Sequence, residues 1–323
     1  MLLLDDPFSA LDASTARLLA GELVAEAGRR TVIVVTDRSD LRAAATRLLQ
    51  VTSTSLTATS QAGDEPVPHT ITALSELWIW PHAGCNHRCV SCDIWQDKSR
   101  RQLSAADVAR WADEWAELGI KEVILTGGEA LMHTDLFGLA DPIRAKGISL
   151  ALLSTGMLLK KNAARVADYF DSVVVSLDGP PEVHDKVRRV PKAYALLASG
   201  ITAVRAIDPD FRFQAKCTVH RYNFRHLPET VRAAQELRLD SLSFAPADVT
   251  SEAFNRAGGW DAERQDDLVV PADALPDLEA ELDRMFTECA DVFGTLVRRS
   301  PEQIRTYVLD YYRGSTAPAT IPK

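Results

Sequence analysis

One stretch decides the fold of this chain: Leu77-Trp-Ile-Trp-Pro-His-Ala-Gly-Cys85-Asn-His-Arg-Cys89-Val-Ser-Cys92, in which an apolar strand runs into a loop with three cysteines. Their spacing is C-x3-C-x2-C. Three thiolates on one short loop can hold three corners of a cubane iron–sulfur cluster, which leaves the fourth iron without a protein ligand. An open iron can bind a small molecule, as an open position does at any catalytic metal.

Two other kinds of site would use the same loop. One is a zinc site completed by His82 or His87. The other is a redox or structural cluster whose fourth cysteine lies elsewhere, at Cys217 or Cys289. Cys217 falls inside a predicted strand, where a small buried residue is the more common role. The cysteine loop alone does not choose among these sites.

Strand-like runs alternate with helical stretches from Leu77 onward. The predicted strands are 77–80, 123–126, 149–153, 172–177, 211–219 and 241–244. The predicted helices between them are 105–118, 136–146, 162–169, 193–206 and 227–237. Repeated units of this kind predict an α/β fold with a parallel sheet covered by helices. Six units are too few for the closed eight-unit barrel, so we expect a partial (β/α)6 TIM-like barrel.

A second motif ends the second predicted strand, Val123-Ile-Leu-Thr-Gly127-Gly128-Glu129. The C-terminal end of a strand is where βα barrels carry their chemistry. Two glycines let a ligand approach the backbone closely, and Glu129 offers an acceptor for an ammonium group. Gly-Gly-Glu by itself is weak evidence for a binding site, because it is more often a turn. The evidence is stronger here because the motif comes one strand after the cysteine loop.

With these two motifs in this order, residues 77 to about 250 resemble the radical S-adenosylmethionine superfamily. Within it, the chain is similar to the maturases of molybdenum cofactor, pyrroloquinoline quinone and anaerobic sulfatases. The resemblance implies a 4Fe-4S cluster held by Cys85, Cys89 and Cys92. It also implies that the methionine amino and carboxylate groups of S-adenosyl-L-methionine chelate the fourth iron, with the Gly-Gly-Glu motif holding the amino group.

Three later segments extend the resemblance. Thr155, in Ser154-Thr-Gly, takes the place of the Asn that relatives often carry near the ribose. Ser176, in Ser-Leu-Asp-Gly, matches a serine that faces the ribose or the methionine part. Arg188, in His184-Asp-Lys-Val-Arg, matches an arginine that pairs with the methionine carboxylate, which suits a planar guanidinium. The structural alternatives are an N-capping Ser176, a turn at Asp178 and a solvated Arg188.

Two positions depart from the family pattern. Ser91 stands before the third cysteine, where an aromatic residue often shields the adenine, so we expect Trp95 or His87 to substitute or the adenine contacts to differ. Ala130 stands where a proline often follows Gly-Gly-Glu. Neither change removes a metal ligand or a charge.

The resemblance implies that a flavodoxin- or ferredoxin-like donor supplies one electron and that S-adenosylmethionine is cleaved. The resulting 5′-deoxyadenosyl radical abstracts hydrogen from a peptide or small-metabolite substrate. An alternative hypothesis is that the chain is not an enzyme. It would then be a non-catalytic protein that binds an iron–sulfur cluster or zinc and arose from a degenerate fusion. Polar candidates for the substrate pocket are Lys216, His220, Asn223 and Asp248, each of which also suits a strand-end, turn or cap role.

The first fifty residues resemble the end of an ABC transporter ATPase domain. Leu2-Leu-Leu-Asp-Asp6 and the residues that follow resemble its Walker B and D-loop stretch, and residues 31–38 resemble its switch strand. Asp6 and Asp37 stand in place of the usual glutamate and histidine, and no G-x-x-x-x-G-K-[ST] occurs. We predict a remnant without ATPase activity, with strands at 2–4 and 31–35 and helices at 12–27 and 41–49.

The predicted domains are the remnant (1–50), a Ser/Thr-rich linker (51–75), the core barrel (76–250) and a helical extension (251–323) with helices at 274–297 and 301–312.

Composition bounds the class of protein. The chain has 323 residues and a formal net charge of -9. We expect no nucleic-acid partner, although a local basic pocket stays compatible with this charge. No apolar run reaches about 18 residues, so no membrane span is expected. The first residues do not form a secretory signal, and we expect a cytoplasmic protein whose thiols stay reduced. Clustered cysteines then favour a metal over disulfides.

Overall fold

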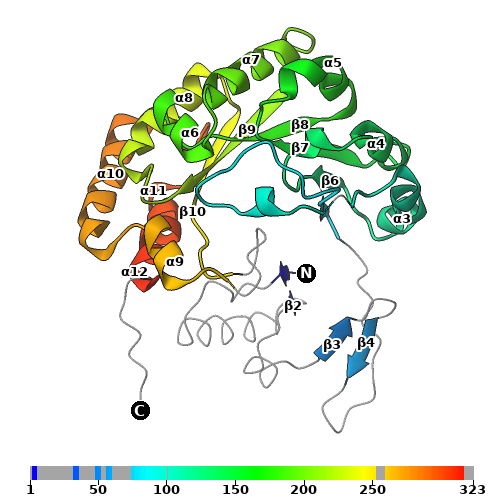
Figure 1. Cartoon of the computed structure of the whole chain (residues 1–323), viewed down its shortest axis with the longest axis horizontal. Coiled ribbons are helices and arrows are strands. Elements are labelled where there is room, and N and C mark those ends of the chain that lie inside the picture. The colour runs from blue at the N-terminus through cyan, green and yellow to red at the C-terminus, as the bar shows by residue number, and fades with distance from the viewer. Residues whose placement is uncertain are drawn as a thin grey trace. The chain divides into compact units, whose positions relative to one another are not determined.

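The computed structural model describes residues 74–99, 101–251 and 259–315, together with four short strands that precede them (Figure 1). The chain divides into two compact units, residues 1–72 and 73–323.

The first unit contains two strand pairs. β1 (Leu2–Asp5) and β2 (Val32–Val35) match the predicted strands at 2–4 and 31–35, and they pair in parallel. β3 (Leu48–Val51) and β4 (Leu56–Thr59) form an antiparallel pair. β3 replaces the end of the helix predicted at 41–49, because Val51 and the threonines of β4 favour extended backbone. β4 lies within the segment predicted as a linker, and the rest of both predicted helices lies outside the described residues.

The second unit is built on six parallel strands in chain order, which confirms the predicted half-barrel. They are β5 (Glu76–Ile79), β6 (Glu122–Leu125), β7 (Ser149–Ser154), β8 (Ser172–Ser176), β9 (Arg212–Val219) and β10 (Ser241–Pro246). Figure 1 shows the strands as a curved wall with the helices on its convex side. The strand ends differ from the predicted ones by one or two residues.

The helices between the strands follow the predicted order. They are α3 (Ala105–Glu117), α4 (Leu136–Arg144), α5 (Leu159–Tyr169), α6 (Pro181–Arg188), α7 (Ala193–Arg205) and α8 (Leu227–Glu236), with the 3-10 turns η1 (Ile94–Gln96), η2 (Ala130–Met132) and η3 (Phe224–His226). α6 was not predicted, because most of its residues are polar and it buries only His184 and Val187. Pro181 starts it at a position that needs no N–H partner.

The two faces of the sheet differ in what covers them. Along β9, Phe213 and Cys217 are fully buried in the core formed with the outer helices. The alternate residues, Gln214 and Lys216, face the inner side of the half-barrel and line a cavity there. The inner face is therefore the one available to ligands.

The C-terminal extension differs from the prediction in its middle. It contains α9 (Ala262–Leu268), η4 (Ala272–Ala274), α10 (Leu275–Glu288), η5 (Ala290–Val292), α11 (Pro301–Ile304), the π-helical η6 (Arg305–Asp310) and α12 (Tyr311–Ser315). The helix predicted over 274–297 ends at Glu288, because Cys289 leaves helical geometry with φ -120°, and Gly294 takes a left-handed φ of 83° farther along. The chain then runs beside β10, where Leu242 N donates to Leu296 O at 2.8 Å.

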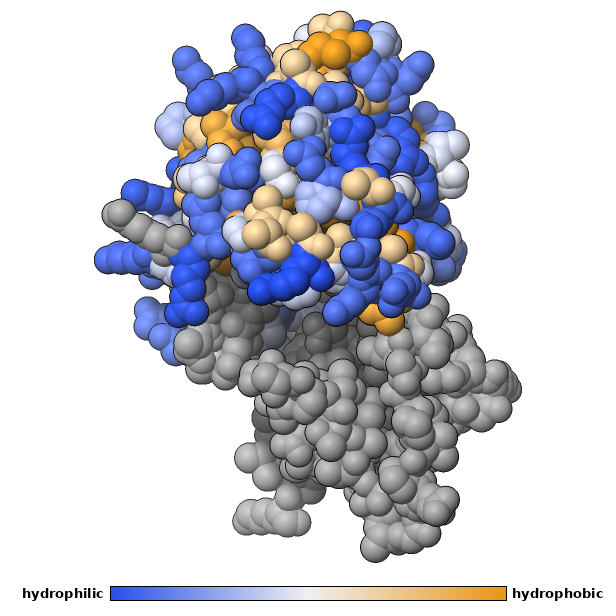
Figure 2. All heavy atoms as spheres, turned by 90° about the vertical axis from the view of Figure 1, so that its right-hand side faces the viewer, coloured by the Kyte–Doolittle hydropathy of each residue, from blue (hydrophilic) through white to orange (hydrophobic). Residues whose placement is uncertain are grey.

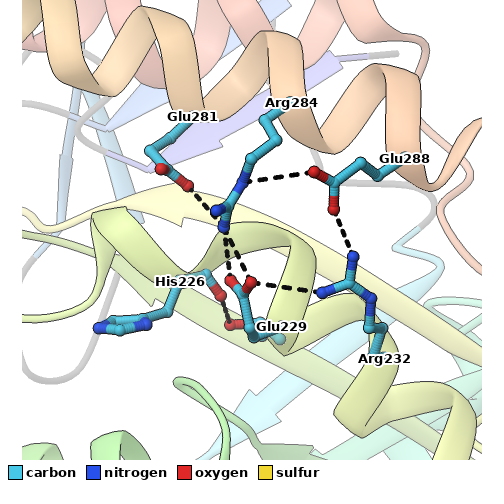
Figure 3. A network of polar contacts seen from close by, with 7 residues as sticks. His226, Glu229, Arg232, Glu281, Arg284 and Glu288 are labelled. Carbon is cyan, nitrogen blue, oxygen red and sulfur yellow. Dashed lines mark hydrogen bonds and ion pairs between the residues drawn. The ribbon is translucent and has the colours of Figure 1, made fainter.

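Polar contacts join α10 to α8 on the outside of the sheet (Figure 3). Arg284 of α10 lies 2.7 Å from Glu229 of α8, and Arg232 of α8 pairs with Glu288 of α10. On the face turned toward α3 and α4, hydrophilic side chains predominate and apolar ones form small separate groups (Figure 2). No helix in the described part of the chain is both long enough and apolar enough to cross a membrane.

Candidate active site

The predicted site residues gather at one edge of the sheet. The cysteine loop (residues 85–92) comes after β5, Gly-Gly-Glu comes directly after β6, Thr155 follows β7 and Ser176 ends β8. Because the strands are parallel, their C-terminal ends lie at the same edge, as in barrel enzymes.

Glu129 is fully buried, and its carboxylate is saturated by donors of the chain itself. It accepts from the backbone N–H groups of Leu131 (3.1 Å) and Thr155 (2.7 Å). The Ser154 hydroxyl donates to it at 2.9 Å and the Thr155 hydroxyl at 2.6 Å. A carboxylate offers about four lone-pair positions, and all are used here. Glu129 therefore ties the end of β6 to the end of β7.

The Thr155 hydroxyl has a second acceptor within reach, Asn86 Oδ1 at 3.3 Å. A hydroxyl carries one proton and can donate to only one acceptor at full strength. Rotation of this hydroxyl toward Asn86 frees one lone pair of Glu129, which a ligand ammonium can then use.

The two glycines are needed for a contact within the chain. A Cβ on Gly127 would lie 2.5 Å from His82 O, and a Cβ on Gly128 would lie 2.3 Å from Gly84 O. Glu129 N donates to Gly84 O at 2.9 Å. The close approach expected for a ligand is thus made by the chain's own backbone, and it fixes the start of the cysteine loop.

Arg188 is nearly buried at the end of α6, so it is not a solvated residue. Its guanidinium lies 2.5 Å from the Asp178 carboxylate and donates to Cys89 Sγ at 3.4 Å. Burial opposes the charged form, but Asp178 outweighs this and raises the pKa of Arg188 above its ordinary value. The predicted partner of Arg188 was the methionine carboxylate; in this structure its partners are Asp178 and the cysteine loop.

Buried polar atoms without hydrogen-bond partners surround this arginine. In the described part of the chain they include both ring nitrogens of His87, Nδ2 of Asn86, and Nε2 of His184 and His220. Burial and the charge of Arg188 lower the pKa of His87 and of His220 to about 3, so both rings are neutral near pH 7. Unpaired buried polar atoms are rare in folded proteins and call for a partner.

The cysteine loop fits a multi-iron cluster. All three loop cysteines are free thiols, and burial, with the charges of Cys89 and Cys92, raises the pKa of Cys85 to about 12. Thiolates crowded in such a place need compensating positive charge, which iron supplies. No three candidate ligands converge on a single ion among the described residues. A cubane places each thiolate on a different iron and does not need that convergence.

The other proposed ligands are engaged elsewhere. His82 accepts from Gly84 N through Nδ1 (3.1 Å), and its Nε2 lies 2.9 Å from Glu129 O. Cys217 is buried in β9, where Asn223 Nδ2 donates to its sulfur at 3.7 Å. Cys289 caps the end of α10. His87, in contrast, keeps a ring without partners among the described residues.

The segment that covers the cysteine loop was not predicted from the sequence. Trp260 Nε1 donates to Asp93 Oδ2 at 2.6 Å, and the Arg264 guanidinium donates to Val90 O while lying over the Trp260 ring. Val90 N also donates to Val187 O at the end of α6 at 3.0 Å. The available signal was the tryptophan itself, an aromatic side chain directly before Asp261, the N-cap of α9.

Two of the four candidate substrate residues have structural roles. Asn223 accepts from His220 N at 2.8 Å and donates to Asp178 O and Thr218 O. Asp248 accepts from the N–H groups of Thr250 and Ser251, as a turn residue does. Lys216 faces the inner side of the sheet.

Among known proteins, a sequence profile of the Radical SAM superfamily matches residues 81–244. The AdoMet-dependent heme synthase of Methanosarcina barkeri is 34% identical over 164 residues, which cover 48% of this chain and 45% of that protein. The pre-heme d1 synthase of Dinoroseobacter shibae is 32% identical over 48% of this chain and 39% of its own length. The chain thus spans less than half the length of these relatives.

Solved structures share the fold at low sequence identity. Native anSMEcpe with bound AdoMet and Kp18Cys peptide has a TM-score of 0.55 and 17% identity, over 73% of this chain and 66% of that one. Streptococcus suis SuiB bound to S-adenosylmethionine has a TM-score of 0.52 and 16% identity, over 70% of this chain and 50% of that one. With the profile spanning half of the sequence and the cysteine loop at the expected edge, the chain belongs to the radical SAM superfamily.

Proposed function

We propose that this chain is a maturase-like enzyme that reductively cleaves S-adenosylmethionine at a 4Fe-4S cluster held by Cys85, Cys89 and Cys92. When bound, these two groups supply a 5′-deoxyadenosyl radical that abstracts hydrogen from a peptide or small-metabolite substrate. One observation carries the proposal: a loop of three free thiols lies beside buried polar atoms that lack partners among the described residues.

The chain's own residues bind and orient the cofactor in this proposal. Glu129 accepts from the ammonium once the Thr155 hydroxyl turns to Asn86. Arg188, whose guanidinium donates to Cys89, pairs with the methionine carboxylate. Gly127 and Gly128 hold the loop start in place, and Ser176 faces the ribose or the methionine part from the end of β8. The segment with Trp260 and Arg264 covers the loop and excludes water.

The remaining parts of the proposal concern partners and domains. A flavodoxin- or ferredoxin-like protein supplies the electron, in a reducing cytoplasm. Residues 1–50 are an ABC-ATPase remnant without ATPase activity, which the parallel pairing of β1 and β2 supports. The names of the relatives include heme synthases and a GTP cyclase, which differ in substrate. The proposed substrate is therefore a peptide or a small metabolite.

Anaerobic reconstitution tests the proposal. The full chain should bind about four iron and four sulfide and, after reduction, convert S-adenosylmethionine to 5′-deoxyadenosine, measured by chromatography. Cys89→Ala should abolish both. Cys289→Ala is the matched control, because it removes a buried thiol outside the loop, and it should retain both. Stoichiometric zinc without iron, or iron without 5′-deoxyadenosine, would instead support a non-catalytic metal protein.

A further inference from the structure

A half-open cavity of about 380 Å³ lies on the inner side of the half-barrel. Its walls come from β8, β9 and β10, from Trp78 on β5, and from the C-terminal segment that contributes Arg298, Arg299 and Tyr307. β5 and β10 are the two edge strands of the sheet. The cavity therefore reaches across the inside of the half-barrel, and its size is within the range of small-molecule sites.

The charge of this cavity is opposite to that of the chain. Its described lining includes three basic side chains, Lys216, Arg298 and Arg299, and no acidic one. None of the three forms an ion pair with another described residue. The neighbouring Arg305, in contrast, pairs with Glu279 at 3.1 Å. In a chain of net charge -9, a group of cations without ion pairs among the described residues favours the approach of an anion.

Desolvation and the nearby Arg299 both lower the pKa of Lys216. A lowered pKa agrees with the geometry, because the two cations repel each other and no acidic side chain lies in the described lining between them. A bound anion would remove that repulsion.

Aromatic surface adjoins the cations. The Arg299 guanidinium lies over the Tyr307 ring, 4.3 Å from its centroid. This stacking holds the guanidinium plane in one orientation, which leaves its edge N–H groups for an oxyanion. Trp78, with about half of its surface exposed, lines the cavity from the other edge strand. A flat apolar body beside the anionic group suits these walls.

The cavity adjoins the proposed cofactor site. Lys216 on β9 is the register partner of Ser176 on β8, so the two residues share one face of the sheet. Ser176 is the residue proposed to contact the ribose or the methionine part. A molecule that fills the cavity is therefore next to the place where the radical would form.

We propose that this cavity binds the substrate through an oxyanion, a carboxylate or a phosphate carried on a flat apolar body, which Lys216 and Arg299 hold. The proposal rests on the proposed function for the chemistry of the site, and it adds the class of substrate.

Three probes test it by isothermal titration calorimetry with the full, reconstituted chain: 2-naphthoate, 2-naphthyl phosphate and the neutral 2-naphthamide. We expect at least one anion to bind at least tenfold more tightly than the amide, as charge-assisted hydrogen bonds require. The stronger of the two anions identifies carboxylate or phosphate. Equal binding of all three probes would overturn the proposal.

Variants locate the binding. Lys216→Gln and Arg299→Gln should each weaken the anion tenfold or more and leave the amide unchanged. Arg299→Lys should restore part of the loss, since it keeps the charge. Lys161→Gln is the control, because it removes an exposed charge on α5 outside the cavity, and it should bind like the wild type. If the anion still binds to both glutamine variants, it binds at another site and the assignment is refuted.

The measurement does not depend on cleavage of S-adenosylmethionine. Anion binding without 5′-deoxyadenosine would refute the proposed function and keep the oxyanion site. Cleavage without selective anion binding would do the reverse. Circular dichroism and iron content check that each variant is folded and loaded.

Discussion

Two regions at the C-terminal edge of the sheet differ in whether their buried polar groups have hydrogen-bond partners. At the ends of β6 and β7, Glu129 accepts from four donors of the chain, so its carboxylate is fully used while the Thr155 hydroxyl points to it. Around Arg188, the rings of His87, His184 and His220 keep nitrogens without partners among the described residues. The first region is complete by itself and holds the fold. The second is incomplete, and a ligand is the natural source of the missing partners.

Because Glu129 belongs to the region that is complete by itself, we expect Glu129→Ala to destabilise the fold. The variant leaves the Leu131 and Thr155 N–H groups and the Ser154 hydroxyl buried without an acceptor. We expect the free energy of unfolding to fall by about 4 kcal/mol, which is at the high end for single substitutions. Urea denaturation of the full chain measures it.

Glu117→Ala is the matched control for this experiment, because Glu117 is an exposed carboxylate on α3. Its effect should stay within about 0.5 kcal/mol. If the two variants unfold at the same urea concentration, Glu129 is not the tie between β6 and β7, and the contrast between the two regions fails.

Arg188→Ala tests the second region. Removing the guanidinium leaves Asp178 buried without its counter-charge, which costs roughly 3 kcal/mol of unfolding free energy. We also expect S-adenosylmethionine affinity to fall about ten- to a hundredfold, measured by titrating the spin-resonance signal of the reduced cluster. A loss of stability with unchanged affinity would make Arg188 a partner of Asp178 and Cys89 only.

Much of this arrangement could be predicted from the sequence, because it follows from short patterns. Buried runs such as 172–177 and the helical periodicity between them predict parallel strands, and parallel strands bring their C-terminal ends to one edge. This logic placed the cysteine loop, Glu129 and Thr155 together.

The partners of the charged residues could not be predicted in the same way. Arg188 and Cys89 are 99 positions apart, and Trp260 and Asp93 are 167 positions apart. No local pattern encodes such pairs, because they depend on how the loops fold over the edge. α6 was missed for a related reason: it is short and mostly polar, and its position depends on contacts with the cysteine loop.

The neutral rings beside Arg188 also make the stability depend on pH. Burial and Arg188 lower the pKa of His220 to about 3, against an ordinary value of 6.5. Between these values the unfolded chain binds a proton that the folded chain does not, so stability rises with pH there and is lost as the pH falls below 6.5. The slope for one such group approaches about 1.4 kcal/mol per pH unit.

His220→Gln removes this group, so the variant should lose less stability than the wild type when the pH is lowered from 6.5 to 5. Urea denaturation at both pH values measures the difference. Identical losses would mean that the His220 ring takes up a proton in the folded state and is not held neutral beside Arg188.

The smallest expected effect belongs to Thr155, the residue that joins the two regions. Its hydroxyl donates to Glu129 at 2.6 Å and can turn to Asn86 at 3.3 Å. Thr155→Val keeps the shape of the side chain and removes this donor, so we expect a loss of about 1 kcal/mol in unfolding free energy. S-adenosylmethionine should bind the valine variant with nearly unchanged affinity, because the hydroxyl makes one hydrogen bond in each state, to Glu129 without the ligand and to Asn86 with it. Thr155→Ser keeps the hydroxyl and should restore the stability, which separates the hydrogen bond from the packing of the methyl group. If the valine variant matches the wild type in stability, the Glu129 carboxylate does not need this donor, and the saturated region is less complete than its geometry indicates.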